Sequence, residues 1–61
     1  MVEKIYFIEN SYDLGMALTK IQDTIPCTLN REYIEMDFSK ITINARAEDL
    51  AFVENTLAPF I

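Results

Sequence analysis

The side chains that could carry out chemistry are few in this sequence. It has no histidine and one cysteine, Cys27, so this thiol has no imidazole to activate it as a nucleophile. General acid–base chemistry would fall to carboxylates, lysine or tyrosine. With one glycine, the chain has no glycine-rich phosphate-binding loop. We therefore expect a protein that is not an enzyme and has no catalytic residue.

Two acidic pairs come closest to a metal site. Glu35 and Asp37 form one pair, and Glu48 and Asp49 form the other. Neither pair lies in a loop with the glycine and alternating oxygen ligands of an EF-hand. Glu48 and Asp49 are explained by their place at the start of a predicted helix, where negative charge interacts favourably with the helix dipole. We expect no metal and no other cofactor.

Size and charge restrict the class of partner. The 61 residues are expected to form one domain, residues 1–61, and ten acidic residues against five basic ones give a net charge of −5. Such a field repels nucleic acid and anionic membranes and attracts basic protein surfaces, although moderate acidity also keeps a small protein soluble. No apolar run approaches the ~20 residues of a membrane span, and the first residues lack a signal-peptide layout. We expect a cytoplasmic protein without membrane contact or direct nucleic-acid binding.

The first half of the chain predicts a strand and then a helix. In residues 2–9, the even-numbered and the odd-numbered positions both include apolar residues. In a strand these two sets lie on opposite faces, so the pattern indicates a strand covered on both faces. Asn10 or Ser11 then caps a helix that ends before Pro26. Its apolar stripe comprises Leu14, Leu18, Ile21 and Ile25. Gly15 inside this helix costs ~1 kcal/mol relative to alanine, which indicates either close approach of another backbone or neutral drift.

The second half predicts a hairpin and a second helix. Residues 26–31 are expected to be a linker, and a two-residue turn at Ser39-Lys40 would join two strands within residues 32–46. One face then holds Ile34, Met36, Phe38, Ile41, Ile43 and Ala45, and the other holds Tyr33, Glu35, Asp37, Thr42, Asn44 and Arg46. Residues 47–57 form the second helix, with an inner stripe of Leu50, Val53 and Leu57.

The element order β-α-β-β-α predicts an α+β fold, with a three-stranded sheet and two helices on one face. This order resembles a ferredoxin-like fold that lacks its last strand. The resemblance implies that one edge of the first strand is open, and pairing with a second copy of the chain would cover it. We therefore expect a homodimer. Its predicted interface comprises Ile5, Tyr6, Phe7 and Ile8.

Exposed apolar and acidic side chains are the candidates for partner contact. Tyr12 and Met16 fall near the side of the first helix opposite its stripe, and Phe52 points away from the stripe of the second. Tyr and Met are enriched in interface cores, although scattered surface residues of this kind are also common. On a strand, Glu35 and Asp37 would lie roughly 6.5–7 Å apart, close to the spacing of adjacent phosphates. The predicted partner-binding residues are Tyr12, Met16, Tyr33, Glu35, Asp37 and Phe52.

These features favour a small acidic protein-binding module that inhibits or regulates a larger partner with a basic surface. A phage or mobile element could encode a protein of this kind. One alternative is a ligand-sensing regulatory module of ferredoxin-like shape, although the chain lacks a glycine-rich ligand loop. Another is an inhibitor that mimics DNA through its acidic face, although Arg46 dilutes the charge there.

Overall fold

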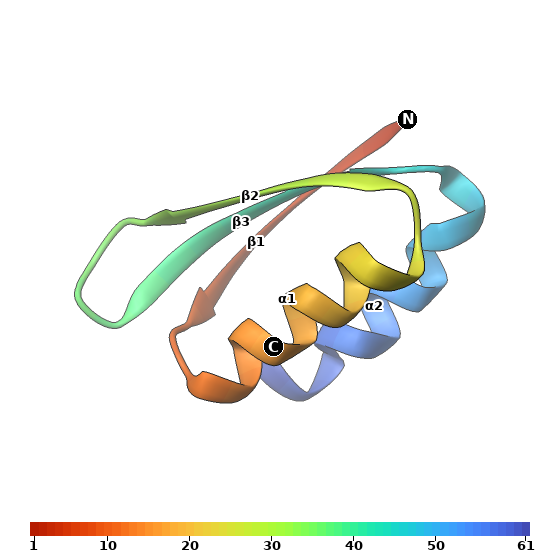
Figure 1. The fold of residues 1–61 in the computed structure, drawn as a ribbon. Coiled ribbons are helices and arrows are strands. Elements are labelled where there is room, and N and C mark those ends of the chain that lie inside the picture. The colour runs from red at the N-terminus through yellow and green to blue at the C-terminus, as the bar shows by residue number, and fades with distance from the viewer.

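The computed structural model describes all 61 residues, and they form a sheet covered on one face by two helices (Figure 1). The principal elements in chain order are β1 (Val2–Glu9), α1 (Tyr12–Thr24), β2 (Cys27–Tyr33), β3 (Phe38–Ala45) and α2 (Leu50–Leu57). Short 3₁₀ turns, Ala47–Asp49 and Ala58–Phe60, flank α2. The predicted α+β fold is therefore confirmed. No helix is long and apolar enough to span a membrane.

The three strands are antiparallel, in the order β1-β3-β2. β3 lies in the centre, so β1 and β2 are both edge strands. In the register, Ile41 of β3 faces Tyr6 of β1 on one side and Arg31 of β2 on the other. Because side chains alternate along a strand, these three residues share the helix-facing side of the sheet. Their neighbours in sequence lie on the other side, which no helix covers (Figure 1).

The hydrophobic core lies between β3 and the two helices. Its nine buried members are Ile8, Leu14, Leu18, Ile21, Ile41, Ile43, Ala45, Val53 and Leu57. All of the helical members belong to the predicted stripes of the two helices, which confirms their periodicity. Fully burying one large aliphatic side chain contributes about 1.5–3 kcal/mol, so this small core can stabilise a short chain only modestly.

The ends of α1 follow from local chemistry. Ser11 is the N-cap, and its Oγ accepts a hydrogen bond of 3.1 Å from the backbone N–H of Leu14. At the other end Ile25 adopts an extended conformation, as expected for the residue before Pro26. Both boundaries were predicted correctly. The two boundaries define the length of α1 between β1 and β2.

The predicted linker and hairpin turn are wrong. The segment expected to be a linker starts β2, and Ser39 and Lys40 lie inside β3. The turn consists of residues 34–37, where the backbone N–H groups of Ile34 and Glu35 donate to the carbonyl of Phe38 at 3.2 and 3.4 Å. In the observed register all seven residues of β2 pair with β3, and the apolar residues Ile34 and Met36 lie in the turn.

The shifted turn changes the face on which several side chains lie. Ile34 and Met36 are exposed in the turn rather than on an inner face, and Phe38 lies on the uncovered side of the sheet. Ile41, Ile43 and Ala45 are buried and face the core as predicted.

The second helix differs in detail from its prediction. Its first turn is 3₁₀, and the α-helical part begins at Leu50. Phe52 was expected to point away from the core, but it is half-buried and packs against it. Val53 and Leu57 are the buried residues of this helix, and Leu50 and Phe52 pack against the core beside them.

Candidate functional site

An open groove of about 580 Å³ lies between the first half of α1 and the end of β2. α1 directs Leu14, Leu18 and Ile21 into the core. The β2–β3 end of the sheet extends past the start of α1, so it is left uncovered (Figure 1). The groove is lined by Ser11, Tyr12, Gly15, Met16, Thr19, Arg31 and Tyr33.

The helical wall of the groove carries two large exposed side chains. Tyr12 is 84% exposed and Met16 is 58% exposed. They lie four residues apart and are therefore neighbours on one side of the helix. Gly15 lies beside them and adds no side chain. This wall therefore presents an aromatic ring and a flexible thioether next to a gap.

The strand wall comes from alternate residues of β2. Cys27 and Leu29 pack against the core, whereas Arg31 and Tyr33 are further along the same side of the strand and line the groove. The Arg31 guanidinium carbon lies 4.8 Å from the centroid of the Tyr33 ring, a cation–π distance. Tyr33 is 67% exposed, so one charged and one aromatic group form this wall.

The Arg31 guanidinium is held by neutral oxygen acceptors. Its Nε donates to Ser39 Oγ at 3.2 Å, and its Nη2 donates to Asn10 Oδ1 at 3.0 Å. Ser39 is fully buried and donates its hydroxyl to the same Asn10 oxygen. The Asn10 backbone N–H donates to the carbonyl of Asp37 at 2.6 Å. This network joins β2, β3, the turn and the start of α1 around one cation.

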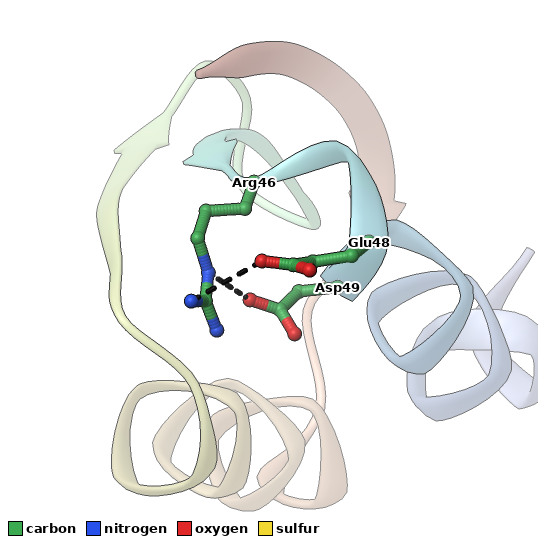
Figure 2. Close-up of polar contacts among 3 residues, drawn as sticks. All are labelled: Arg46, Glu48 and Asp49. Atoms are coloured by element: carbon green, nitrogen blue, oxygen red, sulfur yellow. Dashed lines mark hydrogen bonds and ion pairs between the residues drawn. The ribbon is translucent and has the colours of Figure 1, made fainter.

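Arg31 makes no ion pair with a carboxylate of the chain, and its Nη1 donates no hydrogen bond to the protein. Arg46, the residue after β3, does form ion pairs with carboxylates of the chain (Figure 2). Its Nε lies 2.8 Å from Asp49 Oδ2, and its Nη1 lies 3.2 Å from Glu48 Oε1. The hydrogen bond to Asp49 is the main cause that raises the pKa of Arg46. Arg31 is therefore the arginine whose charge has no carboxylate partner.

The structure brings together three of the predicted partner-binding residues. Tyr12, Met16 and Tyr33 all line the groove. Glu35 and Asp37 lie in the turn after β2, and the bond from Asn10 to Asp37 holds this turn next to the start of α1. Phe52 does not line the groove.

Two expectations about the hairpin face are corrected. Tyr33 lies on the helix-facing side of the sheet rather than on the open face. Glu35 and Asp37 lie in a turn, so the spacing of alternate strand residues does not apply to them. Thr42 and Asn44 do lie on the uncovered side of β3, whereas Arg46 follows the strand.

The predicted dimer residues belong to the edge strand β1. Ile5 and Phe7 are exposed on the uncovered face, whereas Ile8 is buried in the core and Tyr6 is half-buried on the helix-facing side. The groove lies along β2, at the opposite edge of the sheet.

Cys27 lies at the start of β2 rather than in a linker. Burial raises the pKa of its thiol, and the negative charge of Asp49 raises it further. The thiol form is therefore favoured over the nucleophilic thiolate. Cys27 acts as a packing residue in this structure.

The sequence alone did not indicate Arg31, Asn10 or Ser39 as site residues. Arg31 was assigned to a linker, so its alternation with Cys27, Leu29 and Tyr33 was not used. That alternation was the available signal, because it places an arginine on the same side of a strand as two core residues.

Comparison of the chain with known protein families, with curated proteins and with solved structures gives no match, so the functional assignment rests on the groove itself.

Proposed function

We propose that the protein is a small acidic protein-binding module, and that its groove between α1 and β2 docks onto a larger partner and inhibits or regulates it. The observation that supports this most directly is the juxtaposition of Tyr12, Met16 and Tyr33 around Arg31. Tyr, Met and Arg are enriched in interface cores, and Tyr and Arg are enriched among hot spots. Here they come from two separate elements and meet in one groove.

The arrangement of these residues favours binding with little loss of side-chain freedom. Arg31 already has two hydrogen bonds and a stacked ring, so ordering it on binding costs less than ordering a free arginine. Tyr12 and Tyr33 are rigid aromatic groups with large exposed areas. A small ligand inside the groove would leave much of this area in water. A protein surface would cover it, which supports the protein-binding proposal over the ligand-sensing alternative.

The charge of the chain supports a partner with a basic surface. The net charge is −5, and Glu35 and Asp37 are exposed in the turn that borders the groove. Acidic groups at the rim of an interface accelerate association with a basic partner, and salt weakens this effect. DNA mimicry has less support, because these two carboxylates do not form a regular row along a strand.

The test is affinity capture from a lysate of the host, with the tagged protein and two variants. We expect the wild type to retain one partner in a stoichiometric amount, more weakly at high salt. The double variant Tyr12→Ala/Met16→Ala should lose it. Ile61→Ala removes an exposed apolar side chain outside the groove and should keep it. Equal retention by the double variant would contradict the groove as the binding site.

We also propose that two copies pair through the open edge of β1, as the ferredoxin-like form of the fold would allow. β1 pairs only with β3, and Ile5 and Phe7 are exposed beside its free edge. Phe38 of β3 is also exposed there, diagonal to Phe7 in the register. Pairing would provide hydrogen-bond partners for the unpaired backbone groups at the edge of β1, and it would cover exposed apolar surface. Sedimentation equilibrium should show a dimer, and Phe7→Lys should shift it to monomer. A monomeric wild type at millimolar concentration would contradict this pairing.

A further inference from the structure

The groove contains an uncompensated positive charge in an acidic chain. The sequence has ten carboxylate side chains, yet none forms an ion pair with Arg31. The side chain is half-buried, and Nη1 is the guanidinium nitrogen without an acceptor in the protein. A cation in this position favours a ligand group that brings a negative charge and an acceptor together.

We propose that the groove binds a protein segment by holding an Asp or Glu side chain of the partner on the Nη1 side of Arg31, while an apolar neighbour of that residue packs against Tyr12, Met16 and Tyr33. This inference rests on the proposed protein-binding function and names the chemistry of the bound segment. The acidic residue lies within a basic surface of the partner, because the chain has a net charge of −5 and the exposed Glu35 and Asp37 lie in the turn that borders the groove.

The geometry around Arg31 favours a carboxylate at this position. The bonds to Ser39 and Asn10 fix the plane of the guanidinium, and the Tyr33 ring covers one face of it. On the Nη1 side, a Cβ built on Gly15 would lie 3.9 Å from Nη1. The absence of a side chain at Gly15 therefore leaves room for an oxygen to approach. Planar recognition of this kind is specific to arginine, since lysine offers a point charge.

The source of the carboxylate is a side chain rather than a chain end. Chain-terminal carboxylates are commonly held in nests of backbone N–H groups. Here the Leu14 N–H at the start of α1 already donates to the Ser11 cap, and the donor beside the gap at Gly15, Arg31 Nη1, belongs to a side chain. A phosphate is less favoured than a carboxylate, because its second negative charge meets more repulsion from a chain of net charge −5.

Three matched peptides test this inference by NMR titration of the labelled full-length protein. The probes are N-acetyl-Phe-Glu-Phe amide, N-acetyl-Phe-Gln-Phe amide, and N-acetyl-Phe-Gln-Phe with a free carboxyl end. We expect the glutamate peptide to shift the Nε–Hε signal of Arg31 and to bind about 10-fold or more tightly than the glutamine amide, as a charge-assisted hydrogen bond allows. Tighter binding of the free-acid peptide would overturn the side-chain assignment.

Two variants complete the test. Arg31→Gln should bind the glutamate and glutamine amides equally, and Arg31→Lys should recover only part of the difference. A circular dichroism spectrum checks that both are folded. If the two amides bind the wild type alike, or do not shift the Arg31 signal at millimolar peptide, the carboxylate inference is overturned. The docking proposal would survive that result as long as Tyr12→Ala/Met16→Ala still abolished partner capture. Capture unaffected by that double variant would instead overturn the docking proposal.

Discussion

Replacing Gly15 by alanine separates the stability of the fold from binding in the groove. Gly15 is inside α1, where glycine is about 0.5–1 kcal/mol less favourable than alanine. The nearest atom to an added Cβ, outside the helix backbone and adjacent residues, is Arg31 Nη1 at 3.9 Å, an ordinary contact distance. The structure therefore shows no close backbone that would require glycine. We expect Gly15→Ala to raise the free energy of unfolding by about 0.5–1 kcal/mol.

Thermal and urea denaturation followed by circular dichroism measure this change. For a domain of this size, 1 kcal/mol shifts Tm by roughly 4–8 °C, so we expect an increase of about 2–8 °C. Ala17→Gly, two residues further along α1, is the reverse change and should lower Tm, both through the lower helix propensity of glycine and through loss of a methyl group that packs against the core. A lower Tm for Gly15→Ala would refute the reasoning, because it would mean that the helix cannot accept a side chain at this position.

The same variant should weaken binding in the groove. The new methyl group would lie in contact with Arg31 Nη1, on the side where we propose that a carboxylate approaches. We expect a more stable protein that binds the glutamate peptide more weakly than the wild type does. A variant that is more stable and binds equally well would contradict the proposed position of the carboxylate, although not the account of the helix.

Three further predictions concern the fold. The Tyr6 hydroxyl is buried without a hydrogen-bond partner, so Tyr6→Phe should leave stability unchanged or raise it by up to about 1 kcal/mol in urea denaturation. Burial, and then the charge of Glu54, raise the pKa of Tyr6, so the folded state holds this proton more tightly than the unfolded state. The contribution of the protonated Tyr6 to the free energy of unfolding is therefore present below pH 10 and should be lost as the pH rises above 10. Over this range Tyr6→Phe should lose less stability than the wild type, and equal losses would contradict this. Ser11→Ala should cost about 0.5–2 kcal/mol by removing the N-cap, and Ser11→Asp should restore most of it. Ile43→Val should cost about 0.5–1.5 kcal/mol in the buried centre of the sheet, whereas Ile61→Val at an exposed position should change stability by less than about 0.5 kcal/mol.

The parts of the fold that could be predicted are those with a strong local signal. The stripe of α1, its Ser11 cap and the proline after it define a helix without knowledge of the rest of the chain. The bounds of β1 were equally clear, because a dense apolar run followed by a cap permits few alternatives. The expected cover on both faces of this strand was wrong, since Ile5 and Phe7 are exposed on the face that no helix covers. For these elements, local preference and tertiary packing point to the same structure.

The hairpin was predicted incorrectly because its strongest local signal lies in the wrong place. Ile34, Met36 and Phe38 continue the period of two through a turn, whereas β2 has a polar side chain at most of its positions. Its pairing with β3 is a long-range property, set by hydrogen bonds along the full strand. Local alternation alone cannot define the register in such a segment.

Only the residues of the candidate site that depend on local sequence could be predicted. Tyr12 and Met16 were identified from helical spacing, which depends only on α1. Arg31 could not be placed beside them, because that requires the position of β2 relative to α1. Asn10 and Ser39 are 29 residues apart in sequence, and their contact around the Arg31 guanidinium depends on the folded chain.

The most direct test of the proposed function is the affinity of the captured partner for the wild type and for Tyr12→Ala/Met16→Ala, measured by calorimetry with purified proteins. Truncation of a single hot-spot residue costs about 2 kcal/mol or more, which is a loss of affinity of roughly 30-fold, so we predict a loss of at least this size for the double variant. Ile61→Ala should bind as the wild type does, because Ile61 lies outside the groove. Equal affinities for the wild type and the folded double variant would contradict the central claim that this groove is the docking surface.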